Sequence, residues 1–110
     1  MPHEVKNNTK LTEEEFQRFL QNVEEMDHKE DHSRAYRTLS NPIRRKLLEA
    51  LDLNVMKIED FLEKEEIDIT EDQVKYHLSM LEQLNCVMDT ESGWKITPRG
   101  LGFCKNAQLE

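Results

Sequence analysis

The sequence lacks the features that mark several large classes of protein. No apolar run approaches the roughly 18 residues that span a bilayer, and the N-terminus has no secretory signal pattern, so we expect a cytoplasmic protein without a membrane partner. It also has no glycine-rich phosphate loop, no nucleophile with a paired base and no convincing metal-ligand set, so we expect neither an enzyme nor a cofactor. Cys86 and Cys104 form no C-x-x-C motif, and we expect two reduced, largely buried thiols.

The composition indicates one small helical domain with a lean core, because 36% of the 110 residues are hydrophobic and 35% are charged. The net charge of −8 argues against a generic nucleic-acid binder, since affinity for DNA depends on neutralising phosphates. The charge is unevenly distributed, however. Residues 34–57 carry six basic and two acidic residues, whereas residues 58–72 carry one basic and eight acidic residues. A basic segment therefore precedes a strongly acidic one.

The first third of the chain, residues 1–33, is predicted to form an arm and a helix that contribute to dimerisation. Residues 1–10 are polar and without periodicity, and we expect them to be disordered. A helix is expected from the N-cap Thr12 to about Met26. Its apolar stripe must pack either on the domain or on the same helix of a second chain. The stripe comprises Phe16, Phe19, Leu20, Val23 and Met26.

The polar residues 27–33 form either a linker or an exposed continuation of a helix. In a helix, His28 and His32 would have the i, i+4 spacing that can hold a metal through two imidazoles, with Asp31 beside them. Solvated runs of this composition are common and no third ligand is placed, so we predict no metal site.

A basic helix is predicted to follow a short helix at residues 34–39. Asn41 is a good N-cap and Pro42 fits the first helical position. The cationic residues of its N-terminal half form either a solvated helix face or a contact with phosphates. These residues are Arg44, Arg45 and Lys46.

The clearest helix signal lies at residues 70–84, after a short helix at 56–64 and a connector at 65–69. Thr70 can act as N-cap, with Gln73 completing a capping box. The apolar stripe consists of Val74, Leu78, Leu81 and Leu84, and the residues off it include Lys75, Tyr76, Ser79 and Gln83. An ordinary surface helix has this pattern, and so does the helix that a helix-turn-helix places in the DNA major groove.

A small hairpin is predicted directly after this helix, with strands at 86–89 and 94–97. Asn85 suits a left-handed helix terminus, and Pro98 opens a final helix that runs through Cys104. The expected fold is mainly α with a small β-hairpin, a winged helix-turn-helix domain at residues 34–108. Residues 109–110 are consistent with a tag remnant.

Three segments resemble the ArsR-like transcription regulators of bacteria and archaea. LSNPIRRKLLEAL (residues 39–51) is similar to their L-S-x-P-x-R-x-x-I-L-x-x-L segment. VKYHLSMLEQLNCV (residues 74–87) is similar to V-S-x-H-L-x-x-L-x-x-x-G-L-V, and ITPRG (residues 96–100) to L-T-x-x-G. The resemblance covers roughly residues 35–103. It implies a winged helix-turn-helix homodimer, joined through its first and last helices, that binds double-stranded DNA.

The resemblance also implies a set of DNA-contacting residues. Bases would be read by Gln73, Lys75, Tyr76 and His77, and phosphates would be held by Arg44, Arg45, Lys46 and Lys95. For His77, a buried or half-buried hydrogen bond that fixes the helix is favoured over base reading. The wing would be the hairpin at residues 86–97. The cysteine-bearing motif of the metal-sensing members has no counterpart here, so no metal site is implied.

Two functions remain open at this level. The first is a DNA-binding transcriptional regulator. The second is a winged helix that binds a protein partner without DNA, which the acidic segment 58–72 favours because Glu71 and Asp72 would repel phosphates at the start of the recognition helix.

Overall fold

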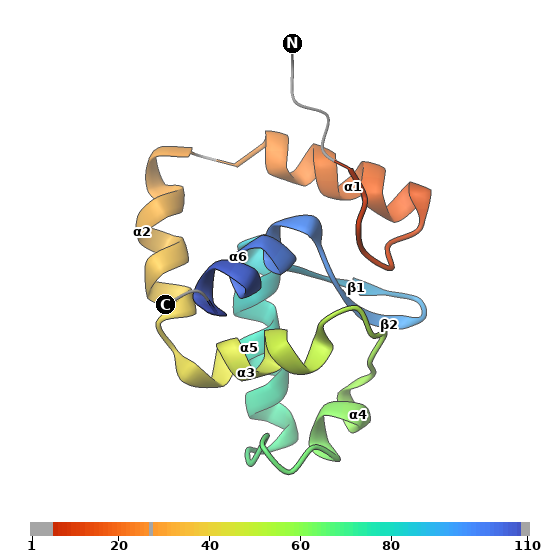
Figure 1. Cartoon of the computed structure of the whole chain (residues 1–110), viewed down its shortest axis with the longest axis vertical. Coiled ribbons are helices and arrows are strands. Elements are labelled where there is room, and N and C mark those ends of the chain that lie inside the picture. Colours follow the sequence, from red (N-terminus) through yellow and green to blue (C-terminus); the bar gives the residue numbers. More distant parts are fainter. Residues whose placement is uncertain (1–5, 27, 109–110) are drawn as a thin grey trace.

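The computed structural model describes residues 6–26 and 28–108, without the side chains of residues 28–32 and 105–108. Over these residues the chain is mainly helical with one two-stranded antiparallel hairpin, as predicted (Figure 1). The elements are α1 (Glu13–Glu24), α2 (His28–Leu39), α3 (Pro42–Leu51), α4 (Ile58–Leu62), α5 (Glu71–Gln83), β1 (Val87–Thr90), β2 (Gly93–Ile96) and α6 (Pro98–Gln108). No helix in this part of the chain is long and apolar enough to span a membrane.

Side-chain caps set where three of the helices begin. The Asn41 side chain accepts from the backbone N–H of Ile43 at 2.8 Å, with Pro42 in the first turn of α3. Thr70 and Gln73 form the expected capping box on α5, with bonds of 3.2 and 2.9 Å. A second box, between Thr12 and Glu15, opens α1. The predicted N-caps are confirmed at all three helices.

The main core lies where α3, α5 and the hairpin meet, with α5 running through the middle of the molecule (Figure 1). The predicted stripe of α5 is confirmed, because its four apolar side chains are each 0% exposed; these are Val74, Leu78, Leu81 and Leu84. Leu101 of α6 also belongs to this core. Leu101 is therefore unavailable for the dimer contact expected of the last helix, whereas Phe103, among the side chains of α6 that the structure describes, is half-buried and remains available.

Each strand of the hairpin differs by one residue from its predicted range. β1 lies one residue later, at 87–90, and β2 lies one residue earlier, at 93–96. The N–H of Cys86 still closes α5 by bonding to Leu81 O at 3.0 Å, so β1 starts one residue later. Asn85 has φ 61°, the predicted left-handed conformation. Met56 was expected in a helix but is extended, because it exchanges two backbone hydrogen bonds with Trp94 of β2. Residues 58–62, and not 56–64, form α4.

The N-terminal part contains two segments whose conformation was open or is predicted wrongly. Of the two alternatives for residues 27–33, the structure shows the helical one, because residues 28–33 form the first half of α2; residue 27 lies outside the described residues. Asn7 bonds Thr9 and Leu11 in a turn, so the expectation of disorder is wrong for residues 7–10. The predicted tag remnant at residues 109–110 lies outside the described residues.

α1 packs on the hairpin face that points away from the main core. Leu11, Phe16 and Phe19 form a second apolar cluster with Met88 of β1, and Leu20 and Val23 are only partly buried against it. Of the two expected positions for the apolar stripe of α1, the structure therefore shows the one on its own domain. In Figure 1, α1 lies across the top of the molecule, beside the hairpin.

Candidate nucleic-acid interface

The outward face of α5 is the polar surface that the sequence singled out. Lys75, Tyr76, Ser79 and Gln83 are exposed, and Tyr76 is 56% exposed although it is aromatic. Tyr76, Ser79 and Gln83 follow one another at i+3 and i+4 spacing, so they share one side of the helix. Ser79 and Gln83 were recognised as polar but were not predicted as site residues. Their helical spacing from Tyr76 was the available signal.

Two predicted base-reading residues already have partners within α5. The Gln73 side-chain carbonyl accepts from the Thr70 N–H at 2.9 Å and is therefore occupied in the cap. Lys75 lies 3.1 Å from the Glu71 carboxylate, and both side chains are more than half exposed. An exposed i, i+4 pair contributes little and exchanges readily, so Lys75 can change partner, whereas Gln73 would have to open the helix cap.

His77 is buried, with 9% of its surface exposed, and this position does not suit base reading. Arg44 Nε donates to His77 Nδ1 at 3.1 Å. Burial, together with the charge of Arg44, lowers the pKa of His77, so the neutral imidazole that accepts this bond is favoured. The Arg44 guanidinium also lies 5.8 Å from the ring centre of Tyr76. The structure favours the positioning role for His77, in which it ties α5 to α3.

The predicted phosphate contacts on α3 differ in exposure. Arg45 and Lys46 are exposed, whereas Arg44 is half-buried and bonded to His77 and to the backbone carbonyl of Thr38. Arg45 and Lys46 are therefore the residues of this cluster that are most open to a partner.

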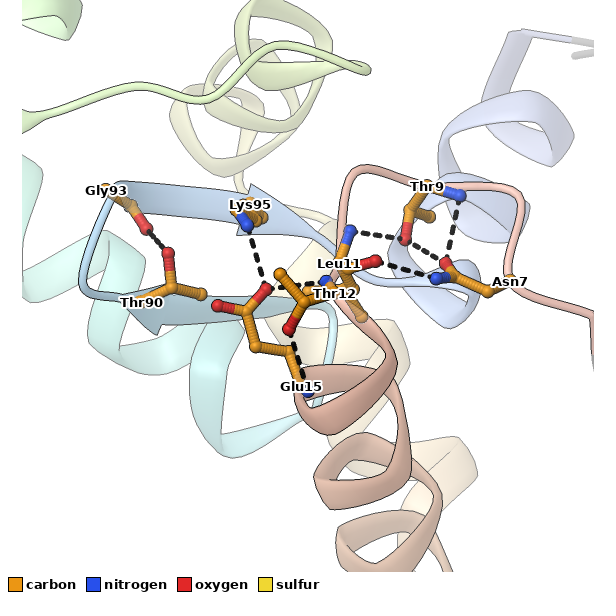
Figure 2. A network of polar contacts seen from close by, with 8 residues as sticks. All are labelled: Asn7, Thr9, Leu11, Thr12, Glu15, Thr90, Gly93 and Lys95. Carbon is orange, nitrogen blue, oxygen red and sulfur yellow. Dashed lines mark hydrogen bonds and ion pairs between the residues drawn. The ribbon is translucent and has the colours of Figure 1, made fainter.

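The prediction that Lys95 contacts phosphate is wrong in this structure. Lys95 Nζ donates to Glu15 Oε1 (Figure 2) at 2.8 Å. Only 6% of the lysine side chain is exposed. Lys95 pairs with Met88 across the hairpin, and alternation along the strands places both side chains on the face that α1 covers. Glu15 Oε1 also accepts from the Thr12 N–H at 2.8 Å. The nearest cation to the hairpin turn is thus held beneath α1.

The surface beside the start of α5 is acidic. In α4 and the connector that follows, four glutamates and one aspartate are exposed; they are Glu59, Glu63, Glu65, Glu66 and Asp68. Glu71 and Asp72 add two more exposed carboxylates in the first turn of α5. An anionic partner would therefore approach α5 from its centre or its C-terminal half.

The described residues contain no group of three histidine, cysteine or acidic side chains placed to hold a metal ion. The side chains of His28, Asp31 and His32 lie outside the description. Cys86 is buried and Cys104 half-buried, and the two form no disulfide, as predicted. Comparison with protein-family models, with curated proteins and with solved structures found no match to this chain. The resemblance to ArsR-like regulators therefore stays a prediction from the three segments.

Proposed function

We propose that the protein is a winged helix-turn-helix regulator of transcription that binds double-stranded DNA as a homodimer. The observation that carries the proposal is the exposed polar face of α5, which is backed by a fully buried apolar stripe. A helix of this kind can enter a major groove without uncovering the core.

The arrangement around α5 supports the proposal. α4 contacts α5 and is joined to it by residues 63–70, and α5 leads directly into the hairpin. The extended residue Met56 pairs with Trp94 of β2, which anchors the turn end of the hairpin to the segment before α4. This arrangement supports the proposal that α4 and α5 act as a helix-turn-helix and that the hairpin acts as its wing.

The proposal assigns roles by exposure. Tyr76, Ser79 and Gln83 face the base edges, and Lys75 leaves Glu71 to reach a guanine or a phosphate. Arg45 and Lys46 hold backbone phosphates, which position the domain but do not read sequence. In a homodimer, a two-fold axis would place two α5 helices on half-sites about one helical turn apart.

The proposal is tested by duplex selection from a random pool at low salt, together with the solution mass of the complex. Lys75→Ala and Arg45→Ala should each weaken binding, and each should flatten the slope of log affinity against log salt by about 1.8, because the homodimer loses one phosphate contact, worth about 0.9, from each of its two copies. The control is Arg18→Ala, which removes an exposed arginine of α1 away from α5. A slope that both variants leave at the wild-type value would contradict the assignment.

A second function is favoured by one observation, the exposed acidic surface of α4 and its connector. This surface suits a protein partner with a basic face. A winged helix used only in this way would show no binding to duplex DNA at about 50 mM salt, where a phosphate footprint is most visible. Selection of a defined duplex would exclude it as the sole function.

A further inference from the structure

A small hollow between α2, α3 and α5 is lined by three arginines. Arg34 and Arg37 come from α2 and Arg44 from α3, and the hollow has a volume of about 300 Å³. The other described residues of its lining are Thr38, Met80 and Gln83. No carboxylate lines it among the residues that the structure describes. On a chain with a net charge of −8, this is a local concentration of positive charge.

Contacts within the fold hold Arg44 in this place. Its Nε donates to His77 Nδ1 and its Nη1 to the carbonyl of Thr38, at 3.1 and 3.4 Å. These bonds use two of the five donors of a guanidinium. The remaining donors are presented by a side chain whose position is already fixed, so a ligand that accepts them loses little conformational entropy.

Arg34 and Arg37 approach the hollow from a different helix. Their i, i+3 spacing places both on the side of α2 that lines it, and both side chains are exposed. Guanidinium groups from two helices can contact several oxygens of one anion at the same time. A carboxylate has two oxygens, which a single arginine fork can satisfy, whereas a phosphate offers more acceptors and more charge.

From this geometry we infer that the hollow formed by Arg34, Arg37 and Arg44 binds a phosphate group. The phosphate can come from either of two sources. One is the DNA backbone, since Gln83 belongs both to the hollow and to the outward face of α5; this source rests on the proposed function. The other is a free phosphorylated compound, which would reach α5 through Met80 and Gln83 and does not depend on DNA binding.

The first arm of the test is a titration with pyrophosphate at low ionic strength, followed by the NMR signals of the Thr38 amide and the Gln83 side-chain amide. Saturable chemical-shift changes are expected for wild type and for the control variant Arg18→Gln, which removes an exposed arginine outside the hollow. The double variant Arg34→Gln/Arg37→Gln should bind at least about tenfold more weakly, because it loses charge-assisted hydrogen bonds. Gln83→Glu keeps all three arginines but introduces a negative charge, and should weaken binding in the same direction.

The second arm measures the salt slope of duplex binding for the same variants. A slope flattened by about 1.8 in the double variant, about 0.9 for the hollow of each copy in the homodimer, but not in Arg18→Gln, identifies the DNA backbone as the source. Pyrophosphate binding with an unchanged slope, or in the absence of any DNA binding by wild type, identifies a free phosphorylated compound; the latter result rejects the proposed function while supporting the hollow. The inference is overturned if neither arm separates the double variant from Arg18→Gln.

Discussion

Gly100→Ala is expected to destabilise the domain by about 3 kcal/mol, and to lower its melting temperature by roughly 10 °C or more. A Cβ at this position would overlap the backbone carbonyl oxygen of Cys86, and would lie 2.9 Å from its carbon and 3.0 Å from Ile96 Cγ1. The first two of these atoms belong to the backbone, so no rotamer change can relieve the overlap. The whole of α6 would have to move away.

Such a movement is costly because the start of α6 is bonded to the end of α5. Thr97 N–H donates to Cys86 O at 3.0 Å, and the Thr97 hydroxyl donates to Asn85 O at 2.6 Å. Arg99 Nε donates to Leu84 O at 2.9 Å. These bonds satisfy carbonyls that the end of α5 leaves without helical partners. A shift of α6 would therefore also loosen the hairpin that is held between the two helices.

Gly102→Ala is the matched control for Gly100→Ala, two residues further along α6. A Cβ at Gly102 meets no atom within 4 Å, so the substitution should only improve helix propensity and raise stability by about 0.5–1 kcal/mol. Thermal unfolding followed by circular dichroism measures both variants. Equal melting temperatures would show that close packing does not explain the glycine of the ITPRG segment.

Local signals in the sequence predicted most of the fold. The caps at Thr12, Asn41 and Thr70 depend on residues within three positions of one another, and helical periodicity alone fixes the buried stripe of α5. The exposure of Lys75 and Tyr76 follows from the same periodicity. These features were predictable because their causes lie within one or two helical turns.

The errors concern contacts between distant parts of the chain. Lys95 is polar and lies beside a turn, so the sequence predicts an exposed cation, but its partner Glu15 is 80 residues away. The backbone of Met56 pairs with that of Trp94, although α4 and α5 lie between them in the sequence, and no local pattern predicts this bridge. The arginine hollow likewise needs three helices to be brought together. Charge counts identified the basic segment, but not which of its residues would meet.

Glu15→Ala is expected to release α1 from the hairpin. The substitution would leave the Lys95 ammonium buried without its carboxylate, at a cost of about 3 kcal/mol, and would remove half of the capping box. Lys95 regains water once α1 leaves, so the cost falls on the docking of α1 and not on the main core. Amide hydrogen exchange should show protection in α1 reduced by about 100-fold and protection in α5 unchanged.

Two further variants separate the ion pair from general effects on α1. Glu13→Ala removes an exposed carboxylate from the same first turn and should cost less than about 1 kcal/mol. Lys95→Met removes the charge but keeps an apolar stem beside Met88, while Glu15 retains the Thr12 N–H and some contact with water. It should therefore be milder than Glu15→Ala, since the carboxylate that remains keeps a hydrogen bond and is 14% exposed, whereas the ammonium left by Glu15→Ala is only 6% exposed. Equal losses of amide protection in α1 for Lys95→Met and Glu15→Ala would contradict the expectation that removing the lysine is milder than removing the glutamate.

Acid should have the same effect on α1 as the loss of Glu15. Burial alone would raise the pKa of Glu15, but the hydrogen bond from Lys95, the bonds from Thr12 and the lysine charge together lower it below its ordinary value of 4.5. A carboxyl with a lowered pKa stabilises the docked state fully above that ordinary value, and this contribution is lost as the pH falls through the lower value of the folded protein. Protection in α1 should therefore fall in wild type below about pH 4.5, and Glu15→Gln should lack this transition because residue 15 no longer titrates. An identical acid transition of α1 in Glu15→Gln would assign it to another group.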